Sequence, residues 1–305
     1  KYYDWSKAIN SMKVSVLMGG TSAERDVSLK TGMAVIKACI DLGYTTRPIE
    51  FLDDYKSLLP ELKNSDIVFN ALHGTIGEDG TIQSWLDKNN LPYTGSDSDS
   101  SRRCMNKDQS KSIVRENNFL TPDWLLIEKK IKLEAINFPC IVKPNAQGST
   151  FGISMVESEE DLAKAITFAS NYDRKILIEN YIEGREITVG ILDDKSLPII
   201  EIIPKHKLYD YECKYNHGMS KYLCPADIEE NITNKIKKDS EKIFKKLGCS
   251  SYGRLDFILD SEGKYYFLEL NTLPGMTATS LLPIAAKTSG LLFKQLINQI
   301  VEISI

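Results

Sequence analysis

The sequence predicts an α/β protein with an open parallel α/β unit at its N-terminus and two mixed units after it. Three observations predict this class. Strand-like and helical patterns alternate up to about residue 97. Loops rich in small residues follow several expected strands. Near the C-terminus, two strand-like runs at 253–259 and 264–270 enclose the turn-forming segment 260–263.

The first unit is expected to begin with a buried strand at 13–18. A second strand at 66–71 leads through a glycine-rich loop, 73–80, into another helix, and 91–94 is a short strand. Between the first two strands, apolar residues at helical spacing predict a helix with a buried face formed by Leu29, Met33, Ile36 and Ile40.

A new unit is expected to start near Ser98, and residues 1–11 are left out of the prediction. Its expected elements are helices at 104–117 and 161–169 and strands at 140–143, 153–156 and 175–179. The last unit is expected to hold strands at 186–192 and 199–203, a polar loop at 209–218, a helix ending at Gly248, the hairpin 254–271 and a helix to about 302.

Composition excludes several classes of protein. The chain has 305 residues and a net charge of −4, which argues against a nucleic-acid surface. Its six cysteines show no C-x-x-C spacing, so reduced thiols in a cytoplasmic protein are expected rather than disulfides or zinc. The apolar runs are too short to span a bilayer, and no signal peptide is recognisable, so no membrane partner is expected.

The C-terminal hairpin carries the most informative polar residues. Glu269 and Asn271 are two apart and therefore share a face. If the turn has two residues, Asp256 lies opposite Phe267 on that face, beside Arg254. Such an all-oxygen cluster suits Mg²⁺, which takes its remaining ligands from water and substrate phosphates. The alternative is a surface hairpin with solvated charges, but the apolar neighbours make unpaired carboxylates costly there.

A second candidate site follows Lys143, which ends a strand before a small-residue loop at 145–152. Gly148 and Gly152 allow the backbone to approach an anion closely, and a lysine there suits phosphate. The alternative is an ordinary turn with an exposed lysine. The P-loop, kinase and dinucleotide glycine signatures are all absent, which opposes those three nucleotide-binding classes.

Other loops leave two interpretations open. Glu24 lies between a strand end and a helix start, where ligands bind in open α/β sheets, but Thr21 to Glu24 also fits a capping box. His73 follows a strand end too, and it could instead be a loop histidine bonded to backbone. The loop around Tyr215 and the one around Gly275 could be simple surface turns.

Taken together, these segments resemble the D-alanine–D-alanine ligase family of the ATP-grasp superfamily. The matching segments are GGTSAERDVSL (19–29), ALHGTIGEDGTIQ (71–83), MNK (105–107), VKPNAQGST (142–150), LIENYIEGREITV (177–189), YDYECKYNHG (209–218), GRLDFILD (253–260) and LELNTLPGMTATSLLP (268–283). They follow the family's order over almost the whole chain. Gln147 departs from the glutamate that is common in the family, and Thr150 is a smaller departure.

The resemblance implies an ATP-grasp fold in which ATP is clamped between the second and third of three domains. The implied domains are 12–97, 98–182 and 183–305. The residues implied to bind ATP are Lys107 and Lys143 at the phosphates, Glu179 with the backbone of Asn180 and Ile182 at the adenine, and Glu186 at the ribose. Those implied to hold two Mg²⁺ (or Mn²⁺) ions are Asp256, Glu269 and Asn271.

The resemblance further implies ligation of two D-alanine molecules through a D-alanyl phosphate, for peptidoglycan precursor synthesis. The residues implied at the amino acids are Glu24 at the first ammonium, His73, and Lys214, Ser280 and the Leu281 N–H at the second carboxylate. Arg254 and the Gly275 N–H are implied to stabilise the tetrahedral oxyanion. A homodimer is expected, and activation by K⁺ is left open.

Tyr215 is implied to join Ser149 and Glu24 in a hydrogen-bonded set near the second amino acid. A free tyrosine has a pKa of about 10, so orientation of the substrate is favoured over base catalysis. In related ligases, phenylalanine at this position accompanies the use of D-lactate, so Tyr215 favours a peptide product over an ester.

Three rival interpretations remain from the sequence. Another ATP-grasp ligase would share every phosphate and metal residue and is opposed only by Glu24, Tyr215 and the pair Ser280-Leu281. A non-catalytic nucleotide-binding protein would have a broken phosphate or metal set, which is not found. An NAD oxidoreductase is opposed by the missing glycine fingerprint.

The Tyr215→Phe variant tests the acceptor assignment. We expect it to bind ATP as the parent does, because Tyr215 is not among the nucleotide residues, and to change the choice between D-alanine and D-lactate. Product analysis with both acceptors measures this. Unchanged discrimination would contradict the assignment.

Overall fold

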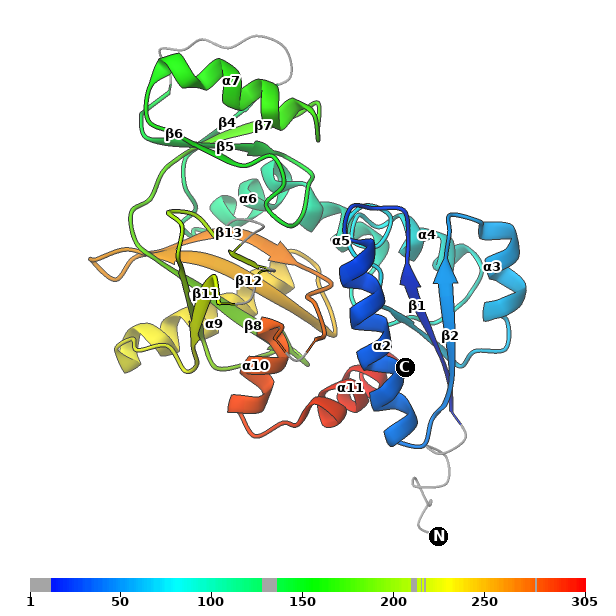
Figure 1. Cartoon of the computed structure of the whole chain (residues 1–305). Helices are drawn as coiled ribbons and strands as arrows, with labels where there is room; N and C mark the ends of the chain where they lie inside the picture. The colour runs from blue at the N-terminus through cyan, green and yellow to red at the C-terminus, as the bar shows by residue number, and fades with distance from the viewer. Residues whose placement is uncertain (1–11, 128–135, 210–212, 215, 217, 278) are drawn as a thin grey trace.

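The computed structural model describes residues 12–127, 136–209, 213–214, 216, 218–277 and 279–305. Within these residues it has three sheets: one parallel and two antiparallel. In Figure 1 the four-stranded sheet forms a separate lobe at the top, with α7 outside it, and the other two sheets lie side by side beneath. The predicted α/β class is confirmed. The domain boundaries at 97 and 182 stay predictions.

The N-terminal sheet has the order β2-β1-β3, with all neighbours parallel. Its strands and helices are β1 (Lys13–Gly19), α2 (Arg25–Asp41), β2 (Thr45–Phe51), α3 (Tyr55–Leu62), β3 (Ile67–Asn70) and α4 (Thr81–Lys88). The predicted strand at 91–94 is reduced to one parallel bridge between Val68 and Tyr93. The prediction missed β2 and α3. In β2, Pro48 and alternate exposed residues hide the apolar pattern.

The predicted buried face of α2 is half wrong. Met33 and Ile40 are each 60% exposed. The buried face consists instead of smaller residues, among them Thr31, Gly32 and Val35. A Cβ on Gly32 would lie 2.4 Å from the Sδ of Met18 on β1, so close packing of helix on sheet requires small side chains there. Apolar spacing alone does not reveal this constraint.

The central unit contains α5 (Ser98–Met105), α6 (Lys107–Glu116) and the sheet β4-β7-β5-β6. The helix predicted at 104–117 corresponds to α6, and its first two residues belong to α5, which the prediction missed. Asn106 separates the two helices, because it has extended backbone and caps α6 through its side chain. The sheet strands and the helix that covers them are β4 (Trp124–Ile127), β5 (Cys140–Pro144), β6 (Ser154–Val156), β7 (Ile176–Asn180) and α7 (Glu159–Ser170). The prediction missed β4.

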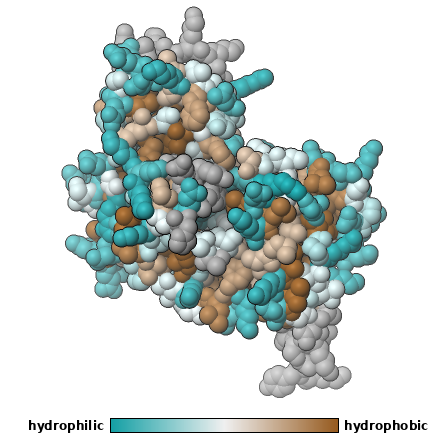
Figure 2. Space-filling model, in the orientation of Figure 1, coloured by the Kyte–Doolittle hydropathy of each residue, from teal (hydrophilic) through white to brown (hydrophobic). Residues whose placement is uncertain are grey.

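This lobe has two unlike faces. Side chains alternate across a strand, so one face packs apolar residues such as Val142 and Ile178 against α7. The opposite face carries Ile141 and Lys143, and Ile141 lies directly across from Glu179. Figure 2 shows polar residues along the outer rim of this lobe and apolar residues toward the rest of the molecule.

The C-terminal sheet has the order β11-β10-β8-β12-β13, with β9 beside β8. Its strands are β8 (Arg185–Leu192), β9 (Lys195–Ser196), β10 (Ile200–Pro204), β11 (Ser220–Leu223), β12 (Tyr252–Leu259) and β13 (Tyr265–Asn271). Apolar residues such as Val189 and Leu255 pack one face against α9 (Glu230–Lys246). The other face carries Glu186, Thr188 and Asp256, because these alternate with the packed residues.

The predicted register of the hairpin is corrected by two residues. Asp256 pairs with Glu269 and not with Phe267. One residue of the shift arises at the turn, where Leu259 pairs with Tyr265, and the other arises from a β-bulge between Asp256 and Phe257. Beyond the bulge the shift is two, which preserves the face of residues 254–256 and 269–271, so the predicted gathering of the polar residues survives the wrong register. Phe267 was predicted on this polar face, but it packs beside Phe257 in the core instead.

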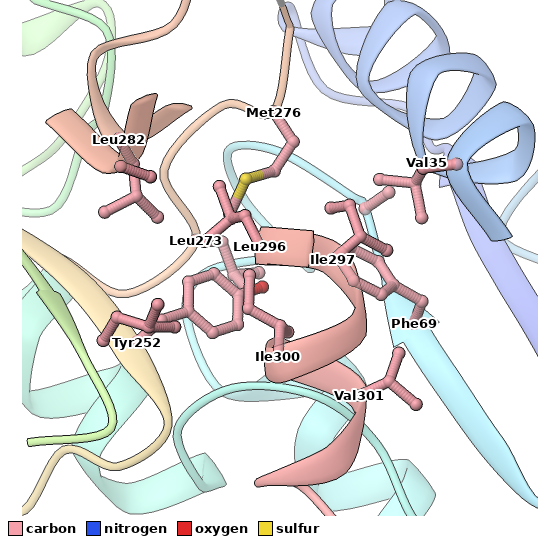
Figure 3. Packing of buried hydrophobic residues seen from close by; sticks show 14 of the residues in the cluster. Val35, Phe69, Tyr252, Leu273, Met276, Leu282, Leu296, Ile297, Ile300 and Val301 are labelled. Atoms are coloured by element: carbon pink, nitrogen blue, oxygen red, sulfur yellow. The ribbon is translucent and has the colours of Figure 1, made fainter. Parts of the chain in front are cut away.

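The two C-terminal helices cross back to the N-terminal unit. They are α10 (Leu281–Thr288) and α11 (Phe293–Glu302), where the sequence predicted one. In Figure 1, α11 lies beside α2, and the two helices are in contact. Figure 3 shows Leu296, Ile297 and Ile300 of α11 pointing into a core that also holds Phe69 of β3 and Tyr252 of β12. None of the helices within the described residues is long and apolar enough to cross a membrane.

This shared core makes α11 a structural requirement for the N-terminal unit. We expect Leu296→Ala to lower the free energy of unfolding by about 2–5 kcal/mol, since it leaves a cavity in a fully buried position. The matched control is Leu292→Ala, one turn earlier and 54% exposed, for which a change within about 0.5 kcal/mol is expected. Urea denaturation measures both, and equal effects would contradict the packing described here.

Candidate active site

Two cavities lie between the lobes. The first has a volume of about 240 Å³ and is lined by residues of all three units. The second has a volume of about 110 Å³ and lies between the two antiparallel sheets. Every predicted site residue that the structure describes lines at least one of them. Tyr215 lies outside the described residues.

The second cavity, called the slot below, combines apolar walls with a few polar groups. Ile141, Phe151, Ile258 and Leu268 supply apolar walls. Its polar lining includes the predicted nucleotide residues Lys143, Glu179, Asn180, Ile182 and Glu186. Apolar walls with a few convergent polar groups are typical of a nucleotide-base site.

The two cavities meet at Lys107. This residue begins α6, and its side chain lines both cavities together with Lys214 and Glu269. Its Nζ donates to the carbonyl oxygen of Gln147 at 2.8 Å and lies 3.1 Å from Oε2 of Glu269. Gln147 departs from the family pattern, but only its backbone takes part in this contact. A group bound in the slot therefore faces a group bound in the first cavity across Lys107 and Glu269.

Glu179 lies between two ammonium groups at the end of the slot. It accepts from Lys143 at 2.5 Å on Oε1 and from Lys111 at 2.9 Å on Oε2. Burial opposes ionisation of Glu179, but the two lysines hold its pKa below the usual value. Sequence reasoning missed Lys111. A signal was present, because Lys111 is one helical turn from Lys107 and so shares its side of α6.

The hairpin gathers Arg254, Asp256, Glu269 and Asn271 on one face, as the sequence predicted. Arg254 donates to both carboxylate oxygens of Asp256, from Nε at 3.0 Å and Nη2 at 2.8 Å. Asp256 also accepts from Oγ1 of Thr188 on β8 at 2.5 Å. Thr188 was missed because nothing in its own strand marks it, and only the pairing of β8 with β12 brings it to the site.

Negative charge is concentrated here. Burial, with Asp256 and Glu269 nearby, raises the pKa of Glu186 to about 8. Burial alone would also raise the pKa of Glu269, but Lys107, Lys214 and Lys143 together lower it to about 2. Glu269 is therefore ionised at neutral pH, and an added cation near it would also favour ionisation of Glu186.

The donor set of these residues fits Mg²⁺ only if other ligands complete the coordination. Asp256 accepts three hydrogen bonds, one from Thr188 and two from Arg254. A carboxylate has about four lone-pair sites, so one of them is left for a metal ion. Among the described residues, the side-chain oxygen of Asn271 accepts one hydrogen bond, from the Leu273 N–H at 3.0 Å. No cluster of three or more His, Cys, Asp or Glu side chains suited to a metal occurs within the described residues. Two carboxylates and an amide suit Mg²⁺ when phosphates and water supply the remaining ligands.

The first cavity contains a second carboxylate site, at Glu24. This residue is the N-cap of α2, but its side chain makes no capping bond, so the capping-box interpretation is wrong. Instead, Oε1 of Glu24 accepts from the Ser149 hydroxyl. The other oxygen, Oε2, is buried and has no partner among the described residues. Burial, and next Glu78, raise the pKa of Glu24. A buried acceptor without a donor suits a ligand ammonium group.

His73 is part of a buried chain and is not bonded to backbone as the alternative proposed. Its Nδ1 lies 3.1 Å from Oε1 of Glu78, and its Nε2 lies 3.1 Å from Oγ1 of Thr31. Thr31 in turn accepts from the Met276 N–H at 3.4 Å. The chain therefore connects the Glu24 side of the cavity to the loop that carries Gly275.

The opposite wall of the first cavity is the start of α10. Ser280 is its N-cap, and its hydroxyl accepts from the Thr277 N–H at 3.0 Å. A Cβ on Gly275 would lie 2.9 Å from Oγ of Ser280, so only glycine leaves that room. The N–H of Leu281 opens the helix, where free N–H groups favour a carboxylate. Lys214 lines the same cavity, with its Nζ 5.2 Å from the ring centre of Tyr209.

Comparison with known proteins identifies the family. A family model described as the D-ala D-ala ligase C-terminus matches residues 112–302, and one for the D-ala D-ala ligase N-terminus matches residues 53–96. A D-alanine–D-alanine ligase of Aquifex aeolicus is 45% identical over 95% of this chain and 100% of its own length. A ligase of the same name from Pelotomaculum thermopropionicum is 43% identical over 96% of this chain and 97% of its own.

Comparison with solved structures leads to the same family. A D-alanine–D-alanine ligase from Bacillus anthracis complexed with ATP has a TM-score of 0.86 at 34% identity, covering 96% of this chain and 97% of its own. The VanG D-Ala:D-Ser ligase of Enterococcus faecalis has a TM-score of 0.85 at 26% identity, covering 97% and 100%. With this similarity over nearly its full length, the chain belongs to the D-alanine–D-alanine ligase family.

Proposed function

We propose that the protein joins two D-alanine molecules into D-alanyl-D-alanine at the expense of ATP, for peptidoglycan precursor synthesis. The observation that carries this proposal is the meeting of two unlike cavities at Lys107 and Glu269. One is a slot suited to a nucleotide, and the other has a buried carboxylate at one wall and a helix N-terminus at the other. An amino acid bound in the first cavity, which holds Glu24, would present its carboxylate to the terminal phosphate of a nucleotide in the slot.

The first step makes the carboxylate of one D-alanine reactive. A carboxylate is a poor acyl donor, because its leaving group would be oxide. Transfer of the γ-phosphoryl group to it yields D-alanyl phosphate and ADP. The ammonium groups of Lys107 and Lys143 would offset the phosphate charge during transfer. Glu24 would hold the ammonium of this D-alanine through its unpartnered oxygen.

The second step forms the peptide bond. The amine of the second D-alanine loses a proton and attacks the acyl carbon, and phosphate leaves. The tetrahedral oxyanion needs hydrogen-bond donors, and Arg254 and the Gly275 N–H line the cavity for that role. Lys214, Ser280 and the Leu281 N–H would hold the second carboxylate. Arg254 keeps Asp256 engaged through Nε and Nη2, which leaves Nη1 for this purpose.

The remaining nucleotide contacts follow from the slot. Glu179 would accept from the adenine amino group, with the backbone of Asn180 and Ile182 beside it, and Glu186 would bind the ribose hydroxyls. Asp256, Glu269 and Asn271 would hold two Mg²⁺ or Mn²⁺ ions, which neutralise phosphate charge when bound.

We further propose a cytoplasmic homodimer, as expected for the family. Light scattering tests the dimer, and turnover with and without K⁺ tests activation by a monovalent cation.

The proposed reaction is tested by phosphate release from ATP and Mg²⁺ with D-alanine, with L-alanine, or with no amino acid. We expect release only with D-alanine, and one dipeptide per phosphate, because each ligation consumes one acyl phosphate. D-serine as an added acceptor tests the second subsite. ATP binding without D-alanine-dependent release would contradict the assignments at Glu24, Ser280 and Leu281.

Glu186 is expected to make the free energy of unfolding depend on pH. The pKa of Glu186 is raised to about 8 in the folded protein, whereas an unfolded glutamate titrates near 4.3. Between these values the folded state binds the extra proton, so this group lowers stability as pH rises through that window. Glu186→Gln should therefore raise the urea midpoint more at pH 9 than at pH 5, in metal-free buffer. The exposed Glu183→Gln is the control, and equal effects at both pH values would refute the explanation.

A further inference from the structure

Lys111 is buried beneath the nucleotide slot and cannot touch a ligand. Its side chain is 0% exposed, and it lines neither cavity. Its Nζ lies 2.9 Å from Oε2 of Glu179 and 5.1 Å from the ring centre of Trp124. A fully buried ammonium group is costly unless paired. The one carboxylate that an ion pair gives it within the described residues is Glu179.

Glu179 accepts hydrogen bonds from two lysines, one on each carboxylate oxygen. Lys143 reaches Oε1 at 2.5 Å from the cavity side, and Lys111 reaches Oε2 from the protein side. The three buried groups together therefore carry one positive charge. Without Lys111, Lys143 and Glu179 would form a neutral pair. Phosphates in the slot would then meet a lysine whose charge is already compensated.

Burial lowers the pKa of Lys111 to about 8, although Glu179 acts in the opposite direction. The ammonium form therefore prevails at neutral pH, as the charge balance requires. The neighbouring aromatic ring supports it, since a cation near the face of a tryptophan is stabilised without water. Trp124 is itself fixed, because its Nε1 donates to Asp108 at 2.8 Å.

We propose that Lys111 is a positioning residue that neutralises Glu179 and so leaves the charge of Lys143 available to the phosphates of the nucleotide. This inference rests on the proposed function, since it assumes a nucleotide in the slot. Lys111 acts through Glu179 and Lys143 and never contacts the substrate. The effect of its loss should therefore depend on how many phosphates the ligand carries.

The Lys111→Met variant tests this with two ligands, ADP and adenosine, measured by calorimetry in the same buffer. Loss of one buried charge near the phosphates should weaken ADP about tenfold, while adenosine should change less than about threefold. In turnover, kcat/KM for ATP should fall, and KM for D-alanine should stay within about twofold. An equal loss for ADP and adenosine would overturn the proposal, since it would indicate general damage to the slot.

The matched control is Arg115→Met. Arg115 lies one turn further along α6, and its guanidinium lies 4.2 Å from the ring centre of the same Trp124. It pairs with Asp123 and makes no ion pair with Glu179. Removal of this cation should leave the ratio of ADP to adenosine affinity within about twofold of the parent. A loss as large as that of Lys111→Met would show that any positive charge on α6 suffices.

A double-mutant cycle with Glu179→Gln isolates the mechanism. Without the carboxylate, the fully buried Lys111 loses its ion-pair partner, and burial then favours its neutral form. Lys111→Met should therefore no longer change the ADP-to-adenosine ratio. This comparison also serves if the single variant fails to fold, because the double variant contains no unpaired buried carboxylate. A tenfold loss of ADP affinity in the Glu179→Gln background would refute the proposal. If the parent chain bound neither ligand, the proposed function itself would fail.

Discussion

The contact between Lys107 and Glu269 is the constraint on which the site depends. It joins the first residue of α6 to the edge strand of the C-terminal sheet, and both cavities open onto it. Two hydrogen bonds hold this junction: the Phe267 N–H donates to the Leu120 carbonyl at 2.9 Å, and the Thr121 side-chain hydroxyl donates to the Phe267 carbonyl at 2.8 Å. These bonds therefore set the position of Lys107 relative to the acidic hairpin before any ligand binds.

Around this contact, both cavities are lined by acidic and basic side chains. Glu24 and Glu78 line the first cavity, Lys107 and Lys214 line both cavities, and Lys143 pairs with Glu179 in the second. Asp256 and Glu186 line the second cavity from the C-terminal sheet. Each buried carboxylate is either held by a cation or left with an acceptor facing the cavity. This arrangement explains the opposite pKa shifts of Glu186 and Glu269, which lie on the same sheet face. It also suits substrates that carry both signs of charge.

Most residues that line the two cavities could be predicted from the sequence, because strand ends and glycine-rich loops mark where ligands bind. The acidic hairpin was predicted on the right face, although its register was wrong, since an even shift conserves the face. Packing was less predictable. Gly32, Thr31 and Val35 form the buried side of α2 because Met18 approaches closely, and apolar spacing favoured Met33 and Ile40 instead. Partners distant in sequence were also missed: only tertiary pairing brings Thr188 to Asp256 and Lys111 to Glu179.

The return of α11 to the N-terminal unit has a consequence for synthesis on the ribosome. Val14, Val35 and Phe69 belong to the first unit, yet their core includes Leu296 and Ile300. A nascent chain extends from its N-terminus, so these apolar side chains emerge more than two hundred residues before their partners. Contacts this distant in sequence form slowly, and exposed apolar surface invites aggregation meanwhile. The first unit can therefore complete its core only after Leu296 and Ile300 have left the ribosome.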